Sequence, residues 1–251
     1  MTDETLPGAH EELPGDRRHG LQRGPLRLVR DIIIIVVVAI LVSFLVKQFL
    51  IKSFYIPSES MNDTLQVNDR ILVNELVPNV VGLKRGDVVV FKDPGGWLTP
   101  QPKPEQSPIA AGATWLLSVV GLASTDSGDH LVKRVIGLPG DHVVCCNSLG
   151  QMSVNGTPLD EPYVRLALWE TRVSAIDFDT TVPADSLWVM GDNRGRSNDS
   201  RYQGDTPGKG FVSLDDVVGR AFVVSWPTQH WAWLDDYPAT FDTVPVSSAD
   251  R

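Results

Sequence analysis

The segment Ile32–Ile51, IIIIVVVAILVSFLVKQFLI, divides the chain and decides its architecture. From Ile32 as far as Val46 it is apolar apart from Ser43 and carries no charge. A helix needs about twenty apolar residues to cross the hydrocarbon core of a bilayer. Strands rarely exceed about ten residues, so a single buried strand of this length is not expected. The segment therefore predicts a transmembrane helix at residues 31–51.

The residues on either side of this segment predict its fate and orientation. Lys47, Lys52 and bulky residues stand where a signal peptide would carry its small-x-small cleavage site, so we expect an uncleaved anchor. Five arginines lie in residues 1–30, and positive charge beside a span favours the cytoplasmic side. We expect residues 1–30 to be a disordered cytoplasmic tail and the chain after Lys52 to lie outside the cytoplasm, anchored in the cell membrane.

The part that follows, residues 52–236, predicts an antiparallel all-β domain. Short segments rich in Val and Ile alternate with Gly, Pro and Asp, a spacing typical of strands joined by turns rather than of βαβ units. An insertion at about 93–129 breaks this pattern. Its apolar stretch Ile109–Ala123 is short for a second span and favours a surface helix or a membrane-facing hairpin. Residues 237–251 are expected to fray.

Charge and cysteine content exclude several classes of function. The formal net charge of −9 argues against nucleic acid as the main partner, because phosphate binding needs clustered Lys and Arg. Cys145 and Cys146 are adjacent, so they cannot close a loop, and two thiols cannot supply a structural zinc site. We expect two free thiols, no metal and no other cofactor.

Three clusters remain once familiar signatures are removed. The chain has no HExxH and no G-x-S-x-G motif, and its histidines outside the tail lie in no distinctive setting. Taken singly, the clusters are a polar linker, a strand that leads into a turn, and a charged loop. They are Ile56–Met61 (IPSESM), Lys133–Asp141 (KRVIGLPGD) and Gly191–Arg201 (GDNRGRSNDSR).

Together, and in this order after the apolar segment, the clusters resemble the conserved boxes of bacterial type I signal peptidases. Gly86–Phe91 (GDVVVF) resembles a further box of that family. The resemblance covers roughly residues 26–226, apart from the insertion. It implies a membrane-bound serine endopeptidase with a signal-peptidase-like antiparallel β fold. It also implies three partners, namely the signal peptides of exported preproteins, the lipid bilayer and the secretion translocon.

The matching positions imply a role for each residue. Ser60, directly before Met61, is the expected nucleophile and Lys133 the expected general base. Ser58 is expected to add its hydroxyl to an oxyanion hole, beside the backbone N–H of Ser60. The remaining positions are expected to support the lysine or to line a pocket for small substrate side chains. Ser197 would orient the amine, Asp199 and Arg201 would form an ion pair, and Ile56, Met61, Leu65 and Val132 would line the pocket.

The residue types fit this chemistry. A serine hydroxyl becomes a good nucleophile only when a neighbouring base removes its proton. Lysine is a base only when neutral, and its reference pKa of about 10.4 must fall through desolvation, which lowers it by up to three to five units. Apolar residues flank Lys133 in the sequence and predict such desolvation. Arg134 should point to the opposite face, because strand side chains alternate.

Two positions depart from the family pattern, and two other functions stay open. Asp63 replaces a common proline and is expected to loosen the turn behind Ser60, while Leu131 replaces a frequent aromatic residue. One alternative is a self-cleaving Ser/Lys protease of the repressor type, which the membrane segment and the acidic balance disfavour. The other is a catalytically silent membrane-tethered adaptor that binds exported chains.

Overall fold

The computed structural model describes residues 25–98 and 127–246. The chain divides after Val42 into two compact units, and each is described by itself. Two predictions concern residues outside the described ranges. They are the disorder of residues 1–24 and the surface helix or hairpin at Ile109–Ala123.

The first element is helix α1, Pro25–Phe49. It begins before residue 31, so residues 25–30 are helical rather than part of a disordered tail. Proline suits the first helical position, because its fixed φ is already helical and its missing N–H would find no acceptor there. Between Leu28 and Phe44 the large apolar side chains of α1 are exposed, and Ile35 has an exposed fraction of 66%. Within the part of the chain that the structure describes, no helix combines the length and hydropathy of a membrane span.

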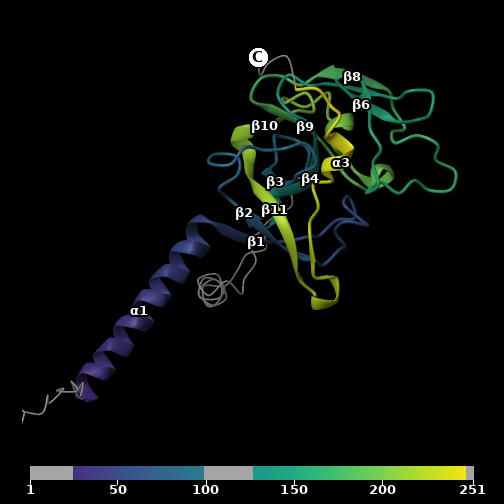
Figure 1. Cartoon of the computed structure of the whole chain (residues 1–251). Helices are drawn as coiled ribbons and strands as arrows, with labels where there is room; N and C mark the ends of the chain where they lie inside the picture. The colour runs from purple at the N-terminus through teal and green to yellow at the C-terminus, as the bar shows by residue number, and fades with distance from the viewer. Residues whose placement is uncertain (1–24, 99–126, 247–251) are drawn as a thin grey trace, which may run out of the picture. The chain divides into compact units, whose positions relative to one another are not determined.

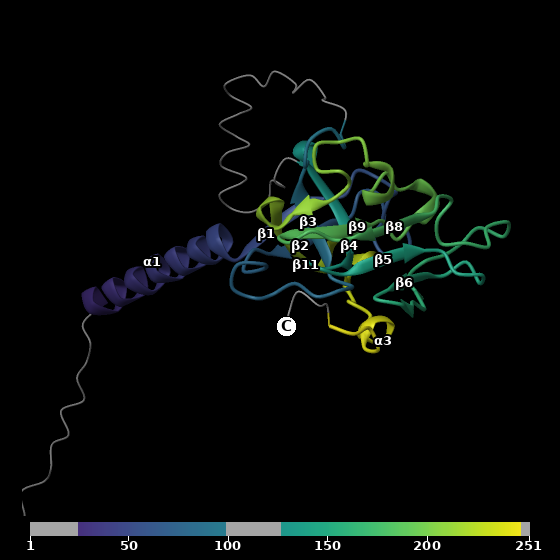
Figure 2. The same ribbon diagram turned by 90° about the horizontal axis from the view of Figure 1, so that it is seen from above.

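The second unit is built on a large antiparallel sheet, in the order β1-β2-β11-β3-β4-β9-β10, with β12 paired to β11. Figures 1 and 2 show β2, β11, β3, β4 and β9 side by side. Its strands are β1 (Ile51–Tyr55), β2 (Arg70–Asn74), β3 (Val88–Lys92), β4 (His130–Gly137), β9 (Ser186–Met190), β10 (Val212–Ser213), β11 (Val217–Trp226) and β12 (Ala232–Trp233).

A smaller sheet has the order β7-β6-β5-β8. It lies toward the β9 end of the large sheet, away from β1 (Figure 2). The recorded strand pairs of both sheets are antiparallel, which confirms the predicted mainly antiparallel β fold. The strands of the smaller sheet are β5 (His142–Cys145), β6 (Met152–Val154), β7 (Thr157–Pro158) and β8 (Phe178–Thr181).

Strand β3 shows why the centre of the large sheet is rigid. Its side chains alternate between two hydrophobic clusters, with Val88 and Val90 in one and Val89 and Phe91 in the other. Both faces are therefore covered, and the strand reads as a continuous apolar run because it has no solvent face. Strand β4 pairs with β3 along its length, and Lys133 lies opposite Val89. The predicted base is thus fixed in the best-packed part of the domain.

Two expectations about the second unit are corrected. Cys145 and Cys146 are joined by a disulfide, so they are not free thiols. The chain end does not fray at residue 237, because helix α3 (Pro238–Phe241) packs on the core. Phe241 and Val244 are buried in the cluster that also contains the smaller sheet, and burial of these apolar side chains holds the segment in place.

Candidate active site

The predicted nucleophile and the predicted base lie side by side. The Nζ atom of Lys133 donates a hydrogen bond of 2.7 Å to Oγ of Ser60. Both residues are buried, with exposed fractions of 4% for Lys133 and 8% for Ser60. They are 73 residues apart in the sequence, so the fold brings them together. A serine hydroxyl within hydrogen-bond reach of a buried amine is the geometry that nucleophile activation requires.

The environment of Lys133 lowers its pKa to about 8, chiefly because burial disfavours the charged ammonium. The carboxylates of Asp199 and Asp192 oppose this change, and the guanidinium of Arg201 adds to it. Desolvation therefore outweighs two nearby carboxylates. About a tenth of the amine is then neutral at pH 7 and about half at pH 8, so the form that a general base needs is populated.

Ser60 is held by a turn and by the loop that follows β9. Backbone hydrogen bonds join Asn62 N to the carbonyl of Glu59 and Leu65 N to that of Met61. The carbonyl of Ser60 itself accepts a hydrogen bond of 3.1 Å from the backbone N–H of Asn193. The predicted first and third clusters are thus in direct contact at the nucleophile.

The predicted ion pair between Asp199 and Arg201 is present. Nε of Arg201 lies 2.8 Å from Oδ1 of Asp199, and both side chains are fully buried. Oδ2 of Asp199 also accepts a hydrogen bond of 2.9 Å from the backbone N–H of Gly191. These hydrogen bonds and the Arg201 charge keep the pKa of Asp199 below its usual value, although burial alone would raise it. The pair fixes the loop on which the third cluster lies.

Gly191 allows the two clusters to approach each other. A Cβ atom at this position would lie 2.3 Å from Oγ of Ser197 and 2.4 Å from the carbonyl oxygen of Ser60. Real Cβ atoms do not approach other atoms so closely. Glycine is therefore needed here for close approach of backbone to backbone, a common reason for glycine beside a site.

Ser197 is buried at the site, and no hydrogen bond joins it to the lysine. Among the described residues, its Oγ has no hydrogen-bond partner. The Ser197 hydroxyl is close enough to Asp199 to help lower the pKa of that carboxyl. Its geometry does not meet that of a hydrogen bond. Its predicted role in orienting the Lys133 amine stays a prediction.

The predicted pocket residues lie around the dyad, with one exception. Ile56, Met61 and Val132 line a cleft of about 550 Å³ that also contains Ser60 and Lys133. Leu65 is fully buried in the cluster behind this wall and does not line the cleft. The predicted oxyanion-hole residue, Ser58, lines the cleft too, and its Oγ lies 3.4 Å from Oγ of Ser60.

Comparison with known proteins agrees with this geometry. A sequence model of the family described as signal peptidase, peptidase S26, matches residues 29–226. The chain belongs to the S26 signal peptidase family. It is 37% identical over 223 residues to a probable signal peptidase I of Mycobacterium leprae, a match that covers 79% of this chain and 76% of that one.

Two further relatives lead to the same conclusion. Signal peptidase I of Mycobacterium tuberculosis is 35% identical over 222 residues, covering 81% of this chain and 74% of that one. Signal peptidase I U of Bacillus subtilis is 32% identical over 176 residues, a match that covers 68% of this chain and 74% of that one. The predicted family and activity are confirmed: this S26 family member is a serine endopeptidase that removes signal peptides. The adaptor and the self-cleaving protease have no better support.

Sequence reasoning missed several residues of the cleft in this signal peptidase. Phe54, Val90 and Trp97 line the cleft together with Ile56 and Val132. From the sequence, Phe54 and Val90 could be predicted only as strand residues. Periodicity indicates that a side chain is buried, but it does not indicate whether that side chain borders a cleft. Trp97 belonged to the segment taken as an insertion.

A buried network behind the dyad was also missed. Arg134 has an exposed fraction of 0% and binds Asp192 through two hydrogen bonds of 2.9 and 2.7 Å. Its guanidinium lies over the rings of Tyr163 and Tyr237, at 4.2 and 5.1 Å from their centroids. Arg134 was predicted to point to the opposite face of β4 from Lys133, and the two side chains bind different partners, Asp192 and Ser60. The arginine ties β4 to the loop after β9, so it supports the strand that carries the base.

The turn after Ser60 differs from expectation at Asp63. Its φ is 80°, which is in the left-handed region. Proline cannot adopt this angle, because its ring fixes φ near −65°. The turn also keeps its backbone hydrogen bonds, including one of 3.0 Å from the N–H of Thr64 to the carbonyl of Met61. The expected loosening is therefore not observed, and the loop is shaped for a residue other than proline.

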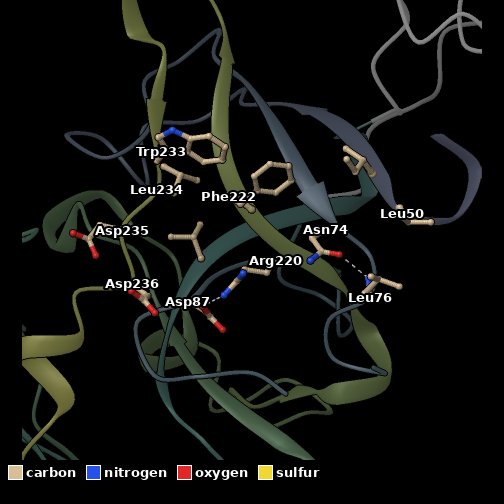
Figure 3. Close-up of a pocket in the computed structure, with 13 residues that line it drawn as sticks. Leu50, Asn74, Leu76, Asp87, Arg220, Phe222, Trp233, Leu234, Asp235 and Asp236 are labelled. Atoms are coloured by element: carbon tan, nitrogen blue, oxygen red, sulfur yellow. Dashed lines mark hydrogen bonds and ion pairs between the residues drawn. The ribbon is translucent and has the colours of Figure 1, made fainter. Parts of the chain in front are cut away.

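A second cavity of about 490 Å³ lies away from the dyad (Figure 3). The Phe222 and Trp233 rings stand close together on one side of it, with centroids 6.0 Å apart. Arg220 and Asp87 form an ion pair at its base. Neither serine nor lysine lines it, so it is not a site for the predicted chemistry.

Proposed function

We propose that Ser60 and Lys133 form the catalytic dyad with which this signal peptidase hydrolyses the bond between a signal peptide and an exported protein. The observation that supports this most is the 2.7 Å hydrogen bond between two buried groups, one of them an amine whose pKa is lowered to about 8. A buried lysine with a perturbed pKa in a cleft is a strong candidate for acid–base chemistry.

The proposed reaction proceeds through an acyl-enzyme. Neutral Lys133 accepts the proton of the Ser60 hydroxyl while Oγ attacks the scissile carbonyl carbon. The resulting ammonium then donates that proton to the leaving amine of the exported protein, and the C–N bond breaks. In the second stage Lys133 accepts a proton from water, which attacks the ester carbonyl and releases the signal peptide with its new carboxylate. The serine hydroxyl is regenerated by the proton that Lys133 returns.

Ser58 is the proposed side-chain donor to the oxyanion. Its hydroxyl lies 3.4 Å from the nucleophile oxygen, which places it beside the carbonyl carbon that Ser60 would attack. A donor aimed at the developing negative charge stabilises the transition state more than the ground state. The backbone N–H of Ser60 is the proposed second donor. Ser197, Asp199 and Arg201 are proposed to keep the amine and its loop in position.

Selection of small side chains is proposed to come from the walls next to the dyad. Ile56 and Met61 are almost fully buried, with exposed fractions of 2% and 1%, and Val132 lies beside Lys133. Packed apolar walls of this kind exclude large side chains sterically, because close-packed side chains cannot move aside to admit them. Leu65 supports them from behind.

We further propose that α1 anchors the protein in the cell membrane, with the N-terminus cytoplasmic. Support comes from the apolar run Ile32–Val46 and from the arginines that precede it. Three tryptophans of the second unit, Trp226, Trp231 and Trp233, are more than half exposed, as is common for indoles at a bilayer surface. The bilayer is then a partner, and the translocon is proposed as the source of substrates.

The test is cleavage of a synthetic signal peptide with an Ala-x-Ala site by the full chain in detergent. Wild type is compared with Ser60→Ala and Lys133→Ala, and Lys84→Ala, outside the cleft, serves as the lysine control. We expect both dyad variants to lose activity and the control to keep it. An active Lys133→Ala variant would reject the dyad, and an inert wild type would favour the adaptor. Resistance of α1 to alkaline extraction from membranes tests the anchor.

A further inference from the structure

The cleft beside the dyad is larger than a pocket for small side chains requires. Its volume of about 550 Å³ lies in the range of sites that enclose whole ligands of moderate size. Near Ser60 its walls are those proposed to admit small residues. Trp97 and Leu98 also line the cleft, and we call them its far wall because they pack with Phe91 and Leu131 rather than with Ile56 and Met61.

This far wall is held in place by a turn at the end of β3. The Asp93 carboxylate accepts hydrogen bonds from the backbone N–H groups of Trp97, at 3.1 Å, and Leu98, at 3.2 Å. Gly95 and Gly96 have φ angles of 112° and 87°, and residues that carry a Cβ atom rarely adopt such angles. The turn returns the chain toward the sheet, so the position of the two side chains is set by specific contacts.

Packing fixes the indole ring against the sheet. The Trp97 ring lies edge-on to Phe91, with centroids 5.7 Å apart and an interplanar angle of 84°. Trp97 is 5% exposed, and it shares a hydrophobic cluster with Phe91 and Leu131. Leu98 packs against the same cluster but is only partly buried. The wall is therefore a rigid apolar surface with Leu98 at its accessible edge.

Strand register gives the distance of this wall from the dyad. Phe91 pairs with Leu131, which precedes Lys133 by two residues on β4. At about 3.3 Å per residue, the wall stands about 7 Å along the strand from the base. Because side chains alternate, Leu131 and Lys133 share one face of β4 and Val132 points to the other. The wall and the small-residue pocket therefore meet opposite sides of an extended substrate.

We propose that Trp97 and Leu98 form a specificity subsite for an apolar side chain at the second or fourth residue before the scissile bond. This inference rests on the proposed function. In an Ala-x-Ala site the first and third residues enter the pocket at Ile56 and Val132. Alternation then turns the second and fourth toward the opposite wall. Leu131, which packs with Trp97, lies on the same strand as the pocket residue Val132, so we assign the subsite to residues on the signal-peptide side of the bond.

The test is a set of peptides in which the second or the fourth residue before the bond is Leu, Ser or Lys. For wild type we expect kcat/KM to be about tenfold higher with Leu than with Ser at one of the two positions, the effect of burying one leucine side chain. Leu98→Ser should remove most of this ratio, and Leu98→Glu should reverse it in favour of Lys. Leu168→Glu, fully exposed and outside the cleft, should leave the ratio unchanged.

A second readout separates this inference from the proposed function. The dissociation constants of the same peptides are measured on the Ser60→Ala variant, in which catalysis plays no part. The same Leu-to-Ser ratio there, lost in Ser60→Ala/Leu98→Ser, supports the subsite even if turnover does not follow the proposed dyad. Equal affinities for Leu and Ser at both positions overturn the subsite, whatever the activity of the dyad. A preference that survives Leu98→Glu overturns it as well.

Discussion

The amine of Lys133 and the hydroxyl of Ser60 are 2.7 Å apart, and both residues are buried in the wall of the cleft. Proximity alone would not make this pair reactive, because an ammonium can only donate a hydrogen bond to the serine oxygen and cannot accept the serine proton. The lowering of the Lys133 pKa to about 8 changes that, since the neutral amine accepts the serine proton. The same burial that brings the groups together therefore also selects the reactive protonation state.

The first prediction concerns the pH dependence of cleavage. Only the neutral amine is active, so kcat/KM should rise about tenfold per pH unit below pH 8 and level off above it. Lys133→Arg should lower kcat/KM by at least about 10³-fold at every pH, because a guanidinium does not lose its proton in this range. The measurement is initial rate against pH for both proteins. A wild-type profile that is flat through pH 8 would contradict the assignment.

The second prediction concerns folding stability. The folded-state pKa of Lys133, about 8, lies below its ordinary 10.5, so in this window the unfolded chain binds more protons than the folded one. Stability should therefore rise with pH between about 8 and 10.5, by about 3 kcal/mol from this residue at about 1.4 kcal/mol per pH unit. Lys133→Met should lack this rise. The check is the difference in free energy of unfolding between the two proteins at about pH 7 and about pH 10.5.

The dyad was predicted from the resemblance of short clusters to the boxes of a known family, because single clusters read only as a polar linker and a strand. The apolar residues beside Lys133 fit the role that the resemblance implies. The large antiparallel sheet was predicted from the residues themselves, since strands and turns have local signals. What failed depends on contacts between distant segments. Leu65 looked like a pocket residue, yet it lies behind the wall, and nothing in its spacing distinguishes these places.

Other errors came from single-residue geometry. Asp63 was read against a family proline, but its φ of 80° is a property of the folded turn. The turn signal Asp93–Gly96 was visible as sequence, but its consequence, the return of Trp97 to Phe91, depends on tertiary packing. The Arg134 network combines residues from β4, the loop after β9 and the segment after β12, so no local pattern predicts it.

The third prediction concerns the buried ion pair. Asp199→Asn leaves Arg201 buried without its counter-charge and should cost about 3–5 kcal/mol of stability. Asp199 raises the Lys133 pKa, so its removal should also move the acid limb of the rate profile below pH 8. Asp199→Asn/Arg201→Gln should recover part of the stability, because neither charge remains. Thermal unfolding and pH–rate profiles test both statements; an unshifted limb in the single variant would refute the electrostatic link.

The fourth prediction concerns the contact between the two catalytic clusters. Gly191→Ala places a Cβ 2.4 Å from the Ser60 carbonyl oxygen and must displace the nucleophile loop or the Ser197 loop. Because misplacement of reacting groups by about 1 Å can cost about 10²-fold, we expect a loss of that order in kcat. Gly204→Ala is the control, since nothing lies within 4 Å of its added Cβ. Equal rates for the two variants would show that the contact is not needed.

The fifth prediction uses the turn behind the nucleophile. Asp63→Pro restores the residue common in the family, yet it should destabilise this protein by about 3 kcal/mol, because proline cannot reach a φ of 80°. Cleavage should fall with it, since Met61 and Ser60 belong to the same turn. Asp63→Gly, which removes the same carboxylate but accepts positive φ, should retain both stability and activity. Melting temperatures and kcat/KM of the two variants decide the matter. If Asp63→Pro is as stable and active as wild type, the turn has a different conformation in solution, and the positive φ at Asp63 is not what holds Ser60 in place.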